Sequence, residues 1–101
     1  MQDLTQALFS GLLNRTFETT LEDASVYPLT LVRIQEYRVI PGMEQFSLEF
    51  EGSAQVVLPQ QIYTLGCEGC EPFSIFLVPV GLTAERSKVT YEAVFNRLIK
   101  E

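Results

Sequence analysis

Apolar residues in this chain fall mainly at every second position, which is the spacing of side chains along one face of a β-strand. The clearest example is residues 46–51, Phe-Ser-Leu-Glu-Phe-Glu, where three apolar residues alternate with one serine and two glutamates. We expect Glu49 and Glu51 on the solvent side of this strand. Similar alternation over residues 16–21 and 89–96 predicts further half-buried strands.

The segment Tyr27–Ile40 is too long for an ordinary strand, and its apolar positions change phase midway. This change predicts a β-bulge or a corner, which lets a small sheet curl into a barrel. Two shorter strands are predicted further on, at Val56–Leu58 and Ile62–Leu65, separated by Pro59.

Residues 72–81 form the longest run of apolar, β-favouring residues. Alternate positions from Phe73 onward are apolar, and so are the positions between them, including Phe76 and Val78. A strand that is apolar on both faces is typically covered on both sides. We therefore expect the barrel interior on one side and the helix or a protein partner on the other.

One helix is predicted at residues 3–14, where Leu4, Leu8 and Leu12 recur at helical spacing. Asp3 and Gln6 have the spacing of a capping box. A helix this short is marginal on its own, so its apolar face needs a docking surface, either on the domain's own sheet or on a neighbouring subunit. The predicted interaction residues are Leu4, Leu8, Leu12, Phe76 and Val78.

These elements predict a mainly β fold, a small antiparallel barrel or sandwich of about seven strands with one N-terminal helix. The chain has 101 residues, which is the length of one domain. We expect a single domain over residues 1–101, with the helix at about 3–14 and the β domain at about 16–96.

The chain is acidic, with 13 Asp and Glu against 7 Lys and Arg and a net charge of −6. The basic residues are scattered rather than clustered, which argues against nucleic acid and anionic membranes as partners. No apolar run approaches the roughly 20 residues of a membrane span, and the N-terminus lacks a signal-peptide pattern. We expect a protein that is cytoplasmic as synthesised and that can belong to an assembled particle or appendage.

The sequence contains no histidine, which removes the commonest general base and the Ser-His-Asp and Cys-His arrangements. Gly66 and Gly69 lie between two predicted strands with no Lys-Ser or Lys-Thr after them, so they do not form a phosphate-binding loop. We expect a protein that is not an enzyme and that has no cofactor.

The segment Cys67-Glu68-Gly69-Cys70 admits three interpretations. A zinc site needs four ligands, so a partner's cysteines or nearby carboxylates would have to complete it. A redox pair favours a helix N-terminus at the first cysteine, whereas here a strand follows and Glu68 and Glu71 disfavour a thiolate. The commoner alternative is a structural hairpin tip, with the cysteines free or disulfide-bonded.

Four segments together resemble an uncharacterised bacterial family that is catalogued only as a domain of unknown function. They are Phe46–Gly52, Leu58–Leu65, Phe76–Gly81 and Tyr91–Asn96. The resemblance extends over nearly the whole chain, except at Gly66–Glu71, where relatives more often have a His-Pro-type turn. Members of that family tend to be encoded near proteins similar to phage tail-collar or tail-fibre components. The resemblance implies a role in an assembly or appendage, with no catalytic residue to carry over.

Our main hypothesis from the sequence is a non-enzymatic structural or protein-interaction domain, with a protein partner or a homo-oligomer. The alternative is a metal-binding or thiol-redox module built on Cys67 and Cys70. A small-molecule-binding barrel is a third hypothesis, which the sequence neither supports nor excludes.

Overall fold

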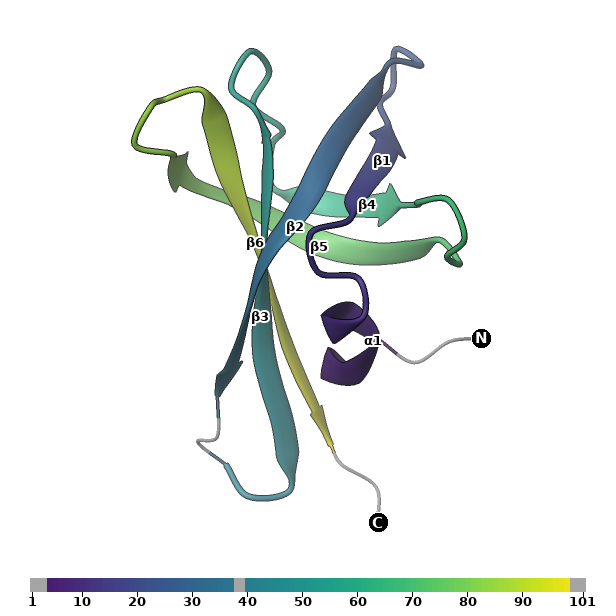
Figure 1. The fold of residues 1–101 in the computed structure, drawn as a ribbon, viewed down its shortest axis with the longest axis vertical. Helices are drawn as coiled ribbons and strands as arrows, with labels where there is room; N and C mark the ends of the chain where they lie inside the picture. Colours follow the sequence, from purple (N-terminus) through teal and green to yellow (C-terminus); the bar gives the residue numbers. More distant parts are fainter. Residues whose placement is uncertain (1–3, 38–39, 99–101) are drawn as a thin grey trace.

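The computed structural model of the protein describes residues 4–37 and 40–98. One short helix, α1 (Gln6–Ser10), precedes a six-stranded antiparallel sheet with the order β1-β2-β3-β6-β5-β4 (Figure 1). The strands are β1 (Thr16–Thr20), β2 (Val26–Tyr37), β3 (Met43–Ser53), β4 (Gln61–Leu65), β5 (Phe73–Leu82) and β6 (Lys88–Leu98).

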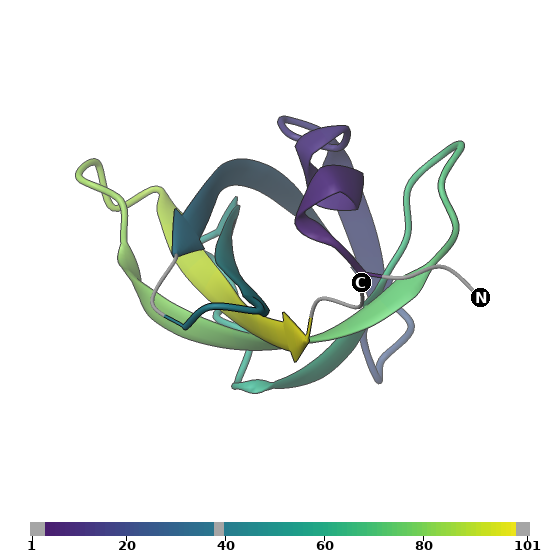
Figure 2. The same ribbon diagram turned by 90° about the horizontal axis from the view of Figure 1, so that it is seen from below.

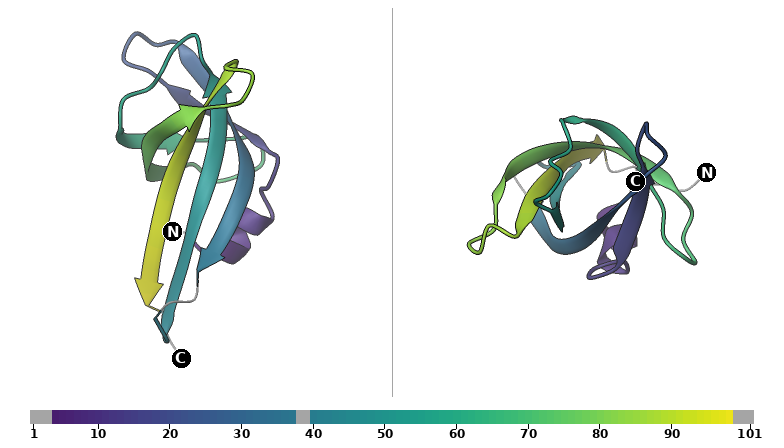
Figure 3. Two further views of the ribbon diagram at one scale, coloured as in Figure 1. Left: turned by 90° about the vertical axis from the view of Figure 1, so that its left-hand side faces the viewer. Right: turned by 90° about the horizontal axis from the view of Figure 1, so that it is seen from above.

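The sheet curls until its two edge strands meet, as the views along the barrel show (Figures 2 and 3). Glu18 of β1 and Gly66, just after β4, exchange two backbone hydrogen bonds of 2.8 and 3.0 Å. These bonds make the sheet a nearly closed barrel, which confirms the predicted mainly β, antiparallel fold. Among the described residues there are six named strands, one fewer than predicted.

The predicted strand Val56–Leu58 is absent, because side-chain hydroxyls take the backbone groups that a strand would pair. The Leu58 N–H donates to the Tyr91 hydroxyl at 2.9 Å, and the Tyr27 hydroxyl lies 3.0 Å from the Val56 carbonyl oxygen. Pro59, which has no N–H, follows at once. The segment is therefore a loop that hydrogen bonds hold against the barrel.

The bulge predicted in the long second strand is confirmed, since the register between β2 and β3 shifts between Leu31 and Arg33. The strand ends at Tyr37 instead of Ile40, and residues 38–39 of the predicted span lie outside the described residues. A second register shift, between Pro79 and Gly81, interrupts the β5–β6 pairing. Irregularities of this kind bend strands and let six of them surround one core.

The helix is shorter than predicted at both ends. Thr5 is the N-cap, with its hydroxyl accepting from the Leu8 N–H at 3.1 Å, and Asp3 of the predicted capping box lies outside the described residues. Gly11 ends the helix, and Asn14 adopts a left-handed φ of 70°. The Asn14 N–H then donates to the Leu31 carbonyl at 2.7 Å, so pairing with β2 replaces further helical turns.

The helix docks on the barrel's own strands, one of the two predicted alternatives. Phe9 is fully buried, and its ring lies 5.3–6.0 Å from those of Phe46, Phe73 and Phe95. These aromatic contacts tie α1 to β3, β5 and β6. No helix in the described part of the chain has the length and apolar character needed to cross a membrane.

Candidate functional site

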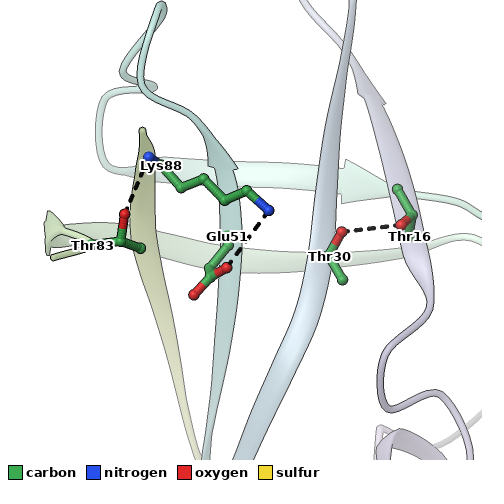
Figure 4. A network of polar contacts seen from close by, with 5 residues as sticks. All are labelled: Thr16, Thr30, Glu51, Thr83 and Lys88. Carbon is green, nitrogen blue, oxygen red and sulfur yellow. Dashed lines mark hydrogen bonds and ion pairs between the residues drawn. The ribbon is translucent and has the colours of Figure 1, made fainter. Parts of the chain in front are cut away.

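The outer surface of β1, of β3, of β2 around Thr30 and of the start of β6 is polar. The hydroxyl oxygens of Thr16 and Thr30 lie 3.0 Å apart, and the Lys88 ammonium lies 4.0 Å from the Glu51 carboxylate (Figure 4). The backbone N–H of Lys88 also donates to the Thr83 hydroxyl at 3.3 Å. Exposed pairs of this kind contribute little to stability. They mark a solvated surface, as predicted for the Glu51 side of β3.

The outer surface of β4 and β5 is polar at one end, where the Thr64 and Ser74 hydroxyl oxygens lie 2.8 Å apart, and apolar beyond it. Ile62 and Phe76 are directly opposed across the two strands, with 68% and 49% of their surfaces exposed. Val78, two positions further along β5, is half-buried, and Val80 beyond it is exposed. We call Ile62, Phe76 and Val78 the β4–β5 apolar face.

The inner side of β5 faces the core through Phe73, Ile75 and Leu77, all of which are buried. The outer side is not covered by α1, because the helix turns Phe9 toward the core, where the Phe9 ring contacts Phe46, Phe73 and Phe95. The sequence predicted that either the helix or a protein partner covers this outer side of β5, and the structure excludes the helix. A protein partner remains the other.

A groove of about 890 Å³ opens where β1 and β4 diverge beyond the Glu18–Gly66 pair. Leu58, Pro59 and Tyr63 give it an apolar floor, of which Leu58 and Tyr63 are buried in the barrel wall. We call it the β1–β4 groove. Its lining comes from residues 18–23, 56–59, 61–64, 66 and 72.

The charge of the β1–β4 groove has one sign. Glu18, Glu22 and Asp23 lie along its β1 side, and none of the described residues that line it is a lysine or an arginine. Hydrogen bonds from the Ser25 side chain and backbone N–H, at 2.5 and 3.0 Å, hold the pKa of Asp23 below its usual range. Asp23 is therefore negatively charged at neutral pH.

Tyrosine hydroxyls fix the floor of the groove. The Tyr63 hydroxyl donates to the Pro59 carbonyl at 2.6 Å, and burial raises the pKa of Tyr63. Burial, followed by the hydrogen bond with Tyr91, raises the pKa of Tyr27 more strongly. These hydroxyls stay protonated at neutral pH, so they hold the 56–59 loop as neutral hydrogen-bonding groups.

Cys67 and Cys70 are joined by a disulfide in the turn between β4 and β5, with their Cα atoms 5.6 Å apart. The Arg15 guanidinium lies 3.7 Å from the Cys67 sulfur and donates to the Glu68 carbonyl at 2.7 Å. Strand β5, not a helix, follows the pair. Within residues 4–37 and 40–98, no three His, Cys, Asp or Glu side chains are grouped to hold a metal.

The five predicted interaction residues do not form one surface. Leu12 is buried, and Leu4 and Leu8 are partly buried against the same core, whereas Phe76 and Val78 lie on the β4–β5 apolar face. The β1–β4 groove was not predicted. The divergence of β1 from β4, which opens the groove, has no local signal in the sequence.

Comparison with known families matches residues 4–95 to a domain of unknown function, DUF6916. The chain belongs to the DUF6916 family. The matched region of this DUF6916 domain includes α1, strands β1 to β5 and most of β6, and therefore both the apolar face and the groove. Comparison with curated proteins and with solved structures gave no match.

Proposed function

We propose that this DUF6916 domain is a non-enzymatic structural or protein-interaction domain that works without a cofactor. The observation that carries the proposal is the β4–β5 apolar face, where Ile62 and Phe76 are exposed side by side. Contiguous apolar surface on a folded domain typically marks a protein contact. The threonine and glutamate side chains on the outer surface of β1 and β3 give the molecule a contrasting solvated side.

The proposed setting is a multi-protein assembly, such as a phage-tail-like particle, of which the domain is a component or an accessory. This part of the proposal rests on the family resemblance seen in the sequence. The protein would be cytoplasmic as synthesised and would then join the particle. Its partner would be another protein or a second copy of the chain.

Substitution of Phe76 by serine is expected to abolish association without unfolding the domain, because the side chain points outward. Light scattering on the purified protein should give a mass above one chain, or a co-purifying partner, and Phe76→Ser should give a monomer. Val26→Ser is the control, since Val26 is similarly exposed, at 53%, but lies on β2. A strictly monomeric wild-type protein with no co-purifying partner would contradict the proposal.

A second candidate function is thiol–disulfide exchange at Cys67 and Cys70. The observation that favours it is the Arg15 guanidinium 3.7 Å from the Cys67 sulfur, since a nearby cation stabilises a thiolate. In such an exchange a dithiol substrate would reduce the Cys67–Cys70 disulfide to two thiols and would itself become a disulfide. Two electrons and two protons would pass between the two pairs.

Thiol titration over a series of dithiothreitol ratios tests this candidate. The wild-type protein should show a reversible two-electron transition, and Arg15→Gln should lower the rate of exchange about threefold to tenfold by destabilising the thiolate. Arg86→Gln, in the β5–β6 loop, is the control for loss of one positive charge. A disulfide that does not re-form after reduction, or equal rates in the Arg15 variant and the wild type, would end the redox hypothesis.

A further inference from the structure

We propose that the β1–β4 groove binds an extended segment of a protein partner, with lysine or arginine side chains, as an additional strand along the barrel's open edges. This inference rests on the proposed function, because it gives the interaction domain a binding site and a partner chemistry. Three features of the groove carry it: its backbone edges, its apolar floor and its acidic rim.

The backbone edges come from the incomplete closure of the barrel. In the part of the chain that the structure describes, the Glu18–Gly66 pair supplies the only backbone hydrogen bonds between β1 and β4. Backbone groups in an antiparallel strand point alternately to its two neighbours. Since Gly66 points to β1, Thr64 and Ile62 present their N–H and C=O groups to the same open side. Glu18 points its backbone groups to Gly66, so by the same alternation Thr20 of β1 also presents its N–H and C=O groups to the open side.

Such free edges are templates for pairing with another strand. The edge of β4 is five residues long, or about 17 Å at the usual rise per residue. Binding of an extended peptide at a sheet edge draws affinity from main-chain hydrogen bonds and specificity from pockets for alternate side chains. The groove offers both, because unpaired backbone groups border a cavity of about 890 Å³.

The apolar floor fits one face of such a strand. Leu58, Pro59 and Tyr63 lie under the space between the two edges, and Val57 and Ile62 are exposed beside them. Hydrogen bonds between three tyrosine hydroxyls and the backbone hold the 56–59 loop in place. The floor is therefore formed before a ligand arrives. Preorganisation of this kind reduces the entropy lost on binding.

The acidic rim selects the charge of the occupant. Glu18, Glu22 and Asp23 have no basic residue among the groove's lining to neutralise them. Complementary charge steers association and discriminates between partners. A second copy of this chain carries a net charge of −6 and is the disfavoured occupant. The best match is an extended segment in which apolar residues, directed to the floor, alternate with lysine or arginine.

An eight-residue peptide of alternating lysine and valine is the probe for this site. We expect it to bind at about 0.1 M salt and to shift the NMR amide signals of Thr20, Ile62 and Thr64. Two matched peptides separate the contributions: one has glutamate in place of lysine, and the other has proline in place of one of its two inner valines. Both should bind at least about tenfold more weakly, the first through charge and the second through the loss of strand pairing.

Two charge-matched variants of the protein locate the binding. Glu22→Lys, on the groove's rim, should weaken binding of the lysine–valine peptide about fivefold to tenfold. Glu85→Lys, in the β5–β6 loop, makes the same change in net charge outside the groove and should leave affinity within about twofold. Both positions are exposed, so both variants should fold.

The proposal is overturned if the peptide does not bind, if Glu22→Lys and Glu85→Lys weaken it equally, or if the proline peptide binds as well as the parent. Binding to Phe76→Ser distinguishes this proposal from the proposed function. That variant should lose association while it retains the peptide, because Phe76 does not line the groove. A wild-type protein that associates but does not bind the peptide would reject the groove proposal alone. A wild-type protein that binds the peptide but does not associate would reject the proposed function alone.

Discussion

Phe9→Ala is expected to lower the free energy of unfolding by about 3–5 kcal/mol, the usual cost of deleting a fully buried phenylalanine. Phe9 is 0% exposed and contacts Phe46, Phe73 and Phe95, which belong to three different strands. Its loss would leave a cavity where the helix meets the barrel. Urea unfolding followed by circular dichroism measures the difference.

Leu13→Ala is the control for Phe9→Ala, since Leu13 lies in the same segment but is 42% exposed. Its expected cost is below about 1 kcal/mol. Similar costs for the two variants would show that α1 is not part of the barrel's core. That outcome would also return Leu4, Leu8 and Leu12 to consideration as a docking surface for a partner.

Gly52→Ala is expected to lower the free energy of unfolding by about 3 kcal/mol, at the upper end of the usual cost of overpacking. A Cβ at this position would lie 2.5 Å from the Tyr27 ring and 2.6 Å from its hydroxyl. The ring cannot move freely, because that hydroxyl donates to the Ser53 carbonyl at 2.7 Å and also contacts Val56 and Tyr91. The substitution must therefore displace either a central strand or this hydrogen-bond network.

Gly81→Ala is the matched control, because a Cβ there meets no atom within 4 Å. We expect it to change stability by less than about 0.5 kcal/mol. Thermal unfolding of the two variants under the same conditions gives the comparison. If Gly52→Ala were as stable as Gly81→Ala, the Tyr27 ring would not be fixed where the structure places it.

The Tyr27–Tyr91 network also connects the fold to the proposed binding site. Tyr91 is fully buried on β6, and its hydroxyl accepts the Leu58 N–H that anchors the groove floor. A change in the barrel's interior at this point would therefore alter the groove without touching its rim. The two proposed surfaces are continuous as well, since Ile62 belongs to both the β4–β5 apolar face and the β1–β4 groove.

The alternation of apolar and polar residues was enough to determine the strand class and the face of most strands. Phe46, Leu48 and Phe50 are buried as their period of two predicts, and the phase change in the second strand corresponds to the bulge between Leu31 and Arg33. These features are local, because neighbouring residues in a strand point to opposite faces whatever the rest of the chain does.

Distant contacts decided the features that the sequence left open. Val56–Leu58 has strand-forming residues, but hydroxyls from β2 and β6 take its backbone groups. The helix stops early because Asn14 pairs with Leu31, 17 positions away. The groove exists because, among the described residues, β1 and the end of β4 exchange backbone hydrogen bonds only at Glu18 and Gly66, 48 positions apart. Backbone pairing over such separations depends on how the whole sheet curves, which no short stretch of sequence encodes.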